Sequence, residues 1–527
     1  MKKIQIVGGG SAGWMAAAYL NAALNYGGQR NVEICLIESP TIPRISVGEA
    51  TIPNIQHILS VIGIDEIDFM KATDATFKQS IKYENWLHND NSYYHHPFSR
   101  YRTIPIDRNG YHWLRSDRSQ PFMHMVSDQP QICDLNLSPK MLGQWDFGTP
   151  LNYAFHMNAQ KFADYLCAFS TKRGVKHITD DVADADVTEG GDIASVKTKE
   201  GLILEADLFI DCTGFAAILI EKKLGVKFID CSKWLLCNRA VTMHVPYDDH
   251  YPGFLRPFTR ATALNAGWVW DIPLQTLRSR GYVYSSDFIS DDEAERELKR
   301  NEGPHSESIS ARIVPFKVGH REKSWVGNCV SIGLAGGFIE PLESTGLYLS
   351  DLASVMLAEH FPHKGVVEPL RNRFNRIMTN RFYEVLDFIN MHYCLTKRDD
   401  TKFWKEVRKP ERINDRLKAK FEYWKIKPPS PNDFADNFFE GQSNTSLPGQ
   451  GGDLRAAMDT AGLWNHESYE CIMYGMDWER ESFAKEFGPN LPPPRIPDLV
   501  LRRQSAAPHK LPTHADWLQK MVGMKQY

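Results

Sequence analysis

Residues 3–14 read KIQIVGGGSAGW, and this segment carries the strongest indication of the fold class. Its first five residues form a β-rich run, glycines follow, and residues 13–24 (GWMAAAYLNAAL) have the composition of a helix. A second β-rich run, residues 32–38, ends in an acid, Glu38. This order predicts a β-α-β unit with a glycine-rich turn at the start of its helix.

The glycines match the G-x-G-x-x-G pattern as Gly8, Gly10 and Gly13. The first glycine permits a tight turn, the second lets the backbone approach a pyrophosphate, and the third lets the helix lie close to the strand. The phosphates would then lie at the helix N-terminus, and Glu38 would accept hydrogen bonds from an adenosine ribose. The pattern therefore predicts a dinucleotide site.

Composition narrows the class of partner. The 527 residues carry 61 Lys and Arg against 65 Asp and Glu, a net charge of −4. Because no long basic cluster occurs, we expect neither a nucleic-acid surface nor a membrane surface, and a small molecule becomes the expected partner. The chain is long enough for two to four domains of roughly 150 residues each.

The cysteines and the N-terminal residues indicate the cellular compartment in which the protein is expected. Nine cysteines are scattered without C-x-x-C spacing, which indicates reduced thiols in a cytoplasmic protein, with no disulfide framework and no zinc site. The N-terminus imitates a signal peptide, but three consecutive glycines interrupt its apolar run. No other segment reaches about 18 consecutive apolar residues, so we predict neither export nor a membrane span.

Two later segments extend the nucleotide module. Residues 202–215 (LILEADLFIDCTGF) read as a β run ending in Asp211-x-x-Gly214. Residues 325–346 read as a β run and a glycine-rich turn before a helix over 347–360. Predicted nucleotide-binding segments thus lie at both ends of about the first 350 residues. The interval between them predicts an inserted substrate region.

The sequence pattern after residue 360 is typical of helices joined by loops. Residues 369–391 have apolar positions three and four apart, as in an amphipathic helix, while 440–452 and 489–497 read as loops. The predicted fold class is α/β. We expect an FAD-binding module of the flavin monooxygenase type with an inserted substrate-side β layer over 1–360, and a mostly helical substrate-covering region over 361–527.

One further segment, GWVWDIP at residues 267–273, reads as a strand with two faces. Trp268, Trp270 and Ile272 share one face because side chains alternate along a strand, and Pro273 removes a ladder donor. Val269 and Asp271 take the other face. The pattern predicts an apolar wall, for which ordinary core packing is the alternative interpretation.

Four motifs together resemble one family. The W-x-W-x-I-P hexad, the glycine loop followed by Trp14, GEATIP at 48–53 and FIEPLESTG at 338–346 occur in the order found in flavin-dependent tryptophan halogenases, and the resemblance runs from residue 4 to about residue 480. It implies reduced FAD from a separate NAD(P)H-dependent flavin reductase, O2 and a halide, chloride or bromide. Hypohalous acid made at the flavin would pass the tryptophan wall through a tunnel to a lysine beside a small aromatic substrate. Members of this family are often homodimers.

The resemblance implies two catalytic residues, Lys78 and Glu343. An ammonium can donate a hydrogen bond to hypohalous acid, or its neutral amine can form a haloamine. A carboxylate can stabilise the cationic arenium intermediate and accept its proton. Lys82 is the nearest alternative lysine, and Glu340 is interpreted as structural.

The remaining site residues also come from the resemblance, and no metal ligand is expected. They comprise FAD contacts, halide ligands, substrate contacts and the tunnel wall: Gly8, Gly10, Ser11, Ala12, Gly13, Trp14, Glu38, Ala50, Leu334 and Leu347; Thr345 and Gly346; His96, Phe98 and Trp464; and Trp268, Trp270, Ile272 and Pro273.

The sequence departs from the family before Trp464. Members acting on free tryptophan carry a tyrosine pair and a glutamate there that hold the amino-acid head, whereas this chain reads GGDLRAAMDTAGLW with no tyrosine from 440 to 463. The departure favours indole or another indole-like aromatic. The alternatives to a halogenase are a single-component flavin aromatic hydroxylase and a non-catalytic flavin-binding protein.

Overall fold

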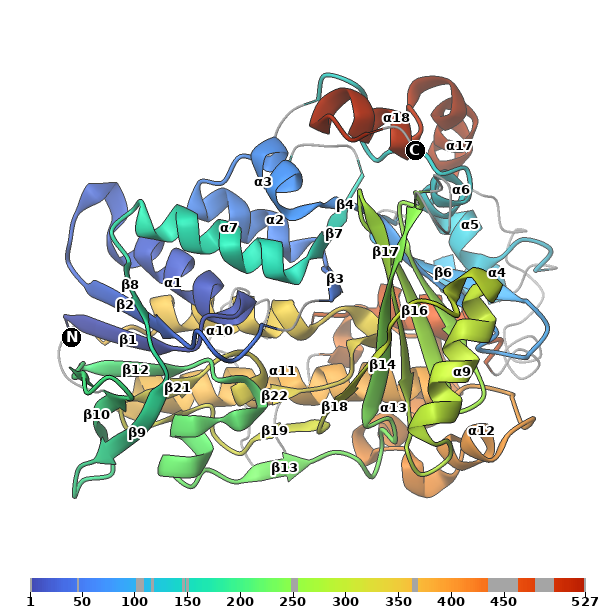
Figure 1. The fold of residues 1–527 in the computed structure, drawn as a ribbon. Coiled ribbons are helices and arrows are strands. Elements are labelled where there is room, and N and C mark those ends of the chain that lie inside the picture. Colours follow the sequence, from blue (N-terminus) through green and yellow to red (C-terminus); the bar gives the residue numbers. More distant parts are fainter. Residues whose placement is uncertain are drawn as a thin grey trace, which may run out of the picture. The chain divides into compact units, whose positions relative to one another are not determined.

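The computed structural model describes residues 2–44, 47–100, 109–114, 118–144, 147, 151–247, 255–362, 368–434, 463–478 and 497–525. The chain forms two compact units (Figure 1). The first unit comprises Met1–Ala75, Phe155–Cys231 and Phe316–Phe382, and the second comprises Thr76–Ala154, Ser232–Pro315 and Tyr383–Tyr527. Each unit is therefore built from three separate stretches of chain.

The first unit is organised around a six-stranded sheet in the order β20-β21-β12-β1-β2-β8. Its strands are β1 (Lys3–Val7), β2 (Glu33–Glu38), β8 (Lys176–Thr179), β12 (Leu208–Asp211), β20 (Trp325–Val326) and β21 (Cys329–Ser331). The strands from β21 to β8 are parallel, and β20 is antiparallel. Helix α1 (Ser11–Leu24) packs against α2 (Asn54–Ile62), α7 (Ala159–Thr171) and α10 (Gly346–Glu359), and Figure 1 shows α1 and α7 on the same side of this sheet.

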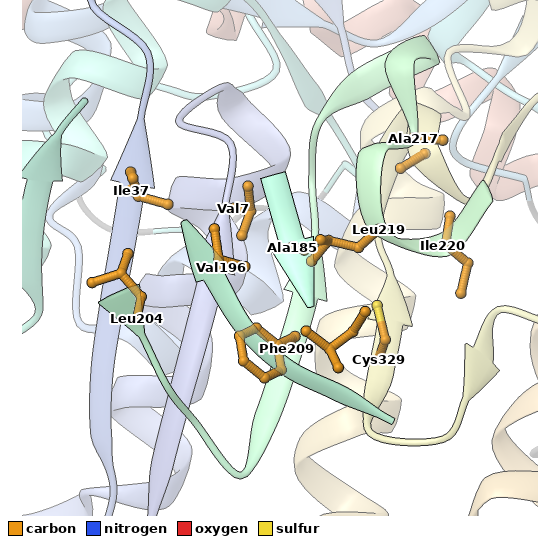
Figure 2. Close-up of a cluster of buried hydrophobic side chains, with 12 residues drawn as sticks. Val7, Ile37, Ala185, Val196, Leu204, Phe209, Ala217, Leu219, Ile220 and Cys329 are labelled. Atoms are coloured by element: carbon orange, nitrogen blue, oxygen red, sulfur yellow. The ribbon is translucent and has the colours of Figure 1, made fainter. Parts of the chain in front are cut away.

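A three-stranded antiparallel sheet packs against the parallel sheet of the first unit. It consists of β9 (Val182–Val187), β10 (Ile193–Thr198) and β11 (Ile203–Leu204). Figure 2 shows side chains of the two sheets meeting in one apolar core, where Val196 and Leu204 lie with Val7, Ile37 and Phe209. The core closes one face of the parallel sheet, which is usual for sheets of this kind.

The predicted β-α-β unit is confirmed, because β1, α1 and β2 follow one another and the two strands pair in parallel. Helix α1 begins at Ser11, two positions earlier than predicted, because Gly10 is its N-cap. The single run predicted over 202–215 is wrong: it divides into β11 and β12, which belong to different sheets. The predicted helix over 347–360 is α10.

Smaller elements complete the first unit. They are β3 (Gly48–Ala50), which pairs with β7 (Ala154–Asn158), helix α3 (Glu66–Thr73), the strands β13 (Phe228–Asp230), β19 (Gly319–Arg321) and β22 (Gly337–Phe338), and the short helices η3 (Ile218–Lys223), η5 (Gly333–Ala335) and η6 (Pro341–Glu343). Asp211, in the Asp211-x-x-Gly214 segment, has a structural role. Its carboxylate accepts the backbone N–H groups of Leu219 and Ile220 at 2.8 Å each and so holds the start of η3.

The second unit contains a seven-stranded sheet in the order β18-β14-β17-β16-β15-β5-β6. Its strands are β5 (Ser80–Glu84), β6 (Tyr93–Pro97), β14 (Arg239–Pro246), β15 (Thr259–Ala263), β16 (Gly267–Pro273), β17 (Leu277–Tyr284) and β18 (Arg312–Pro315). All neighbours are antiparallel except β15 and β5. Helix α9 (Asp291–Glu302) packs on β14 and β17, and the hydroxyl of its N-cap Ser290 accepts the Glu293 N–H at 3.3 Å.

The described elements after residue 345 are helical, which confirms the predicted helical C-terminal region. They include α11 (Glu368–Cys394), α12 (Lys402–Val407), α13 (Asp415–Trp424), α15 (His466–Gly475), α17 (Asp498–Lys510) and α18 (His514–Trp517). The predicted loops at 440–452 and 489–497 lie outside the described residues, except for Pro497. Among the described helices, we find none whose length and apolar character would let it cross a bilayer.

Candidate active site

The glycine-rich turn of the first unit has the shape that a pyrophosphate requires. Gly8 has φ +112°, and a Cβ there would lie 2.3 Å from the carbonyl oxygen of Cys212. A Cβ on Gly13 would lie 1.9 Å from the Gly8 carbonyl oxygen, so the start of α1 fits closely on the turn. At Gly10, by contrast, a Cβ would meet nothing within 4 Å. The turn is closed at two glycines and open at the one expected to approach the phosphates.

The first turn of α1 continues the predicted FAD contacts. Ser11 and Ala12 are half-buried, and the Ser11 hydroxyl donates to the Ala159 carbonyl at 3.1 Å. Trp14 is fully buried, and its ring lies edge-on to His177 with centroids 5.0 Å apart. This contact connects α1 to β8, whose His177 also pairs with the acid Glu38.

Glu38 ends β2, as predicted, and lies in a polar cluster. Its carboxylate pairs with Arg44 at 2.5 Å and with His177 at 2.8 Å. A Cβ on Gly9 would lie 1.8 Å from Glu38 Oε2, so the acid lies directly beside the glycine-rich turn. Hydrogen-bonding groups at this position match the needs of an adenosine ribose.

The turn before α10 carries the two residues predicted to bind the halide, Thr345 and Gly346. Thr345 is the N-cap of this 14-residue helix and is fully buried, and its hydroxyl has no hydrogen-bond partner among the described residues. A Cβ on Gly346 would meet nothing within 4 Å, so the space beside the first residue of the helix is open. Unpaired N–H groups and the helix dipole favour a negative ion at such an end.

The same turn carries the two acids of FIEPLESTG. Glu343 ends η6 and is 1% exposed, and Glu340 is fully buried one residue before η6. Ser344 follows with φ +59°, the left-handed conformation that reverses the chain before α10. Leu347 and Ala50, predicted at the flavin ring, are each 7% exposed, and Leu334 is half-buried in η5.

Two further acids of the first unit were not selected from the sequence. Burial raises the pKa of Asp351 in α10 well above its ordinary value, and it raises the pKa of Glu49 in β3 to about 7. Asp351 is therefore protonated near neutral pH, while the Glu49 carboxyl, with a pKa of about 7, changes its charge in that range. The GEATIP motif offered a signal for Glu49, whereas no local pattern separates Asp351 from a solvated helix residue.

Lys78 lies in the second unit on the short strand β4 (Thr76–Lys78) and is fully buried. Its Nζ lies 5.3 Å from the centroid of the Phe98 ring, within cation–π range. The backbone N–H of Phe98 donates to the Gln79 carbonyl at 3.1 Å, which holds these two predicted residues together. The alternative lysine, Lys82, instead pairs with Asp134 at 2.8 Å.

The other two predicted substrate contacts are connected through a residue that the sequence did not reveal. His96 lies on β6, and the ring of Phe388 in α11 lies 5.6 Å from it. Phe388 also stacks on Trp464, with ring centroids 4.3 Å apart and planes 20° apart. The apolar periodicity of α11 could have placed Phe388 on a buried face, but no motif marked it.

The GWVWDIP segment forms β16, and its predicted two faces are confirmed. The rings of Trp268 and Trp270 lie on one face with centroids 6.3 Å apart, while Val269 contributes to the core under α9. Ile272 is 6% exposed. At the strand end, the Thr76 hydroxyl donates to the Pro273 carbonyl at 2.6 Å. The wall strand is thereby bonded to the strand that carries Lys78.

Trp270 takes its position from the neighbouring strand. It faces Gly281 of β17 in the register, and a Cβ on Gly281 would lie 2.0 Å from the indole ring. The ring therefore lies across the glycine backbone. A larger residue at this position would displace it.

Comparison with known proteins identifies the family. The tryptophan halogenase family model matches residues 3–487. Tryptophan 7-halogenase RebH from Lentzea aerocolonigenes is 36% identical over 95% of this chain and 93% of its own length. Among solved structures, the tryptophan halogenase from Shewanella frigidimarina NCIMB 400 has a TM-score of 0.88 at 31% identity, covering 99% of this chain and 98% of its own.

A second solved structure connects the family to its cofactor. Tar14, a tryptophan C-6 flavin-dependent halogenase from taromycin biosynthesis, has a TM-score of 0.86 at 32% identity and covers 99% of this chain and 100% of its own. These proteins match the chain across both units, with the glycine-rich turn in the first and Lys78 in the second. The chain belongs to the tryptophan halogenase family and is a flavin-dependent halogenase.

Proposed function

We propose that the enzyme uses reduced FAD, O2 and chloride or bromide to halogenate an indole-type aromatic, indole itself or a tryptophan-like compound, by electrophilic substitution. Lys78 presents the electrophile, and Glu343 accepts the proton that leaves the ring. Thr345 and Gly346 bind the halide. His96, Phe98 and Trp464 contact the aromatic substrate.

The observation that carries this proposal is the environment of Lys78. A lysine is rarely buried without a specific reason, since removing an ammonium from water is costly. Lys78 is fully buried against the Phe98 ring, whereas Lys82 on β5 is partly exposed. The burial supports a chemical role for Lys78 rather than a solvated one.

The first unit supports the cofactor assignment. The open backbone at Gly10 and the polar cluster at Glu38 fit the pyrophosphate and the ribose of FAD, and Ala50, Leu334 and Leu347 supply apolar contacts for its ring. Bound reduced FAD would supply, together with O2, the oxidising power that converts a halide into hypohalous acid. The buried Thr345 hydroxyl would donate to the halide before that conversion.

Halogenation of the substrate exchanges one bond to the halogen for another. The carbon–halogen bond forms while the halogen–oxygen bond of hypohalous acid breaks. The oxygen leaves as water after taking a proton from the Lys78 ammonium, and the ring proton passes to the Glu343 carboxylate. An ammonium suits the first transfer because it both donates the proton and makes the halogen more electrophilic. The wall of Trp268, Trp270, Ile272 and Pro273 would keep the substrate from the flavin.

The substrate class rests on the residues before Trp464. Residues 441–463 lack the tyrosine pair that the family resemblance implies for enzymes acting on free tryptophan, and their charged residues are Asp453, Arg455 and Asp459. All of this stretch except residue 463 lies outside the described residues. The proposal also includes a separate NAD(P)H-dependent flavin reductase, a homodimer, a cytoplasmic location and a module boundary near residue 360.

The test is a mass-spectrometric assay with FAD, a flavin reductase, NADH and O2, offering indole and tryptophan in parallel with chloride or bromide. Four proteins are compared: the unaltered enzyme, Lys78→Met, Glu343→Gln and Lys82→Met as a matched lysine control. We expect halogenated product to fall at least about 100-fold in the first two variants, as for loss of a general acid or base, and to stay within about twofold in the third. Hydroxylated product that needs neither halide nor Lys78 would instead establish the hydroxylase alternative.

A further inference from the structure

The strand that carries Lys78 is short and depends on partners outside its sheet. Strand β4 has only three residues, all buried. Its first residue, Thr76, donates through its hydroxyl to the Pro273 carbonyl at 2.6 Å, and the residue that follows it, Gln79, donates its N–H to the Pro257 carbonyl at 2.7 Å. A buried strand must place every N–H on an acceptor, so the N–H of Phe77, directly before Lys78, needs one too.

That acceptor is a histidine from the far end of the chain. The Phe77 N–H donates to His514 Nε2 at 3.1 Å, across 437 positions of sequence. The Phe77 ring also contacts the His514 ring at 5.8 Å and the Trp517 ring at 4.6 Å, measured between centroids. The backbone and the side chain of the residue before Lys78 thus both rest on helix α18.

Within the second unit, hydrogen bonds also tie the C-terminal segment to residues 136–138. The His514 N–H donates to the Asn136 carbonyl at 2.8 Å, and the Ser138 N–H donates to the Pro512 carbonyl at 2.9 Å. The carbonyl of Leu137, between these two, accepts the Gln79 side chain at 2.8 Å. Residues 136–138 therefore bond both to the His514 segment and to Gln79, the residue after Lys78.

The protonation state of His514 suits an acceptor. Burial lowers its pKa to about 3, and an interaction with the Leu255 backbone opposes this only in part. The ring is neutral at ordinary pH, so Nε2 keeps its lone pair for Phe77 while Nδ1 carries the proton. A neutral ring also avoids a second positive charge beside the strand that carries the Lys78 ammonium.

From this geometry we propose that His514 is a positioning residue for halogenation: by accepting the Phe77 N–H it holds the β4 backbone at the place from which Lys78 meets the halogen and the substrate. The inference rests on the proposed role of Lys78. His514 lies beyond residue 487, the last residue that the family model matches.

The test compares two amides at this position, His514→Gln and His514→Asn. A glutamine oxygen lies the same number of bonds from Cα as Nε2 and can accept the Phe77 N–H, whereas the asparagine oxygen is one carbon too short. Both variants are polar and of similar size, so they impose similar costs on folding. Rates and KM are measured for the full-length enzyme with reductase, FAD and halide, using indole and tryptophan.

We expect the glutamine variant to keep kcat within about threefold and the asparagine variant to lose about tenfold in kcat with an unchanged KM, because a misplaced catalytic group affects the chemical step and leaves ground-state binding intact. NADH oxidation through the flavin should continue at the original rate in both. Equal kcat values in the two variants, or a loss in KM alone, would overturn the inference.

The failure of this inference can be told apart from the failure of the proposed function. If Lys78→Met retains halogenation, the role of Lys78 is wrong, and a difference between the two His514 variants then has no explanation through it. If Lys78→Met is inactive while the two His514 variants match, only the positioning role is wrong. Should the asparagine variant not fold, His514→Met, which lacks an acceptor but fills the space, is compared with His514→Gln on the same criteria.

Discussion

Replacement of Asp271 by asparagine should destabilise the protein severely, although the change adds or removes hardly any volume. Asp271 lies on the face of β16 opposite Trp268 and Trp270. Its carboxylate accepts Arg278 Nε at 2.9 Å and Arg278 Nη2 at 2.7 Å, a paired arrangement, and it accepts Arg280 Nη1 at 3.2 Å. The substitution removes the charge that these buried guanidinium groups share.

The magnitude follows from what remains. Burial by itself would raise the pKa of Asp271, but the guanidinium groups of Arg278, Arg280 and Arg260 outweigh it and hold that pKa well below its ordinary value. Without the carboxylate, Glu302 is left to balance both Arg278 and Arg280, whose side chains are at most 3% exposed. Removing one partner of a buried ion pair costs about 3–5 kcal/mol. For a unit of this size that corresponds to a fall of about 5–8 °C in melting temperature.

The assay is thermal unfolding of Asp271→Asn, with Asp415→Asn as the matched control. Asp415 also forms an ion pair, with Lys418 at 3.1 Å, but its side chain is 96% exposed. The same chemical change there should shift the melting temperature by about 1 °C or less, because exposed pairs contribute about 0–1 kcal/mol. The shift at Asp271 should also persist in high salt. Equal shifts for the two variants would refute the reasoning.

Three further outcomes are expected. Gly10→Ala should weaken FAD binding at least tenfold in a fluorescence titration without lowering the melting temperature. Gly13→Ala should lower both the FAD affinity and the melting temperature, because only a Cβ on Gly13 collides with the protein itself. Above pH 6.5, His514 is neutral in both the folded and the unfolded protein. Below pH 6.5 the histidine of the unfolded chain is protonated, whereas the folded protein, in which its pKa is about 3, keeps it neutral. The free energy of unfolding should therefore fall by about 2 kcal/mol by pH 5. The His514→Gln variant should lose less stability between pH 7.5 and pH 5. Equal decreases in melting temperature over this pH range for the variant and the unaltered protein would contradict the prediction. Gly281→Ala should displace the Trp270 ring and change the near-ultraviolet circular dichroism, while an unchanged spectrum would show that the ring does not depend on this glycine.

Local signals were reliable wherever a residue's task involves its neighbours in the chain. The roles assigned to Gly8 and Gly13 depend on backbone geometry within one turn, and both appear in the structure as close approaches that exclude a side chain. The alternation in β16 is equally local, since successive side chains must point to opposite faces. The boundaries of α10 followed from the turn before it and those of α11 from the spacing of apolar residues, and both differed by at most three residues.

The run over 202–215 shows where such signals end. An apolar β-rich run indicates a strand, but it does not name the partner strand, because strand pairing joins residues far apart in sequence. The turn at Glu205–Asp207 separates β11, which pairs with β10, from β12, which pairs with β1. One run therefore supplied strands to two sheets.

The sequence by itself determined the nucleotide-binding β-α-β unit, the two faces of the tryptophan strand, the helical C-terminal region and, by resemblance, the family. The tertiary structure alone decided what surrounds Lys78: the Phe98 ring, the bond from Thr76 to Pro273, and the acceptor that His514 supplies. The reason is physical. A buried N–H or ammonium is satisfied by whatever group the fold brings within 3 or 4 Å, and no periodicity in a chain encodes a partner 437 positions away.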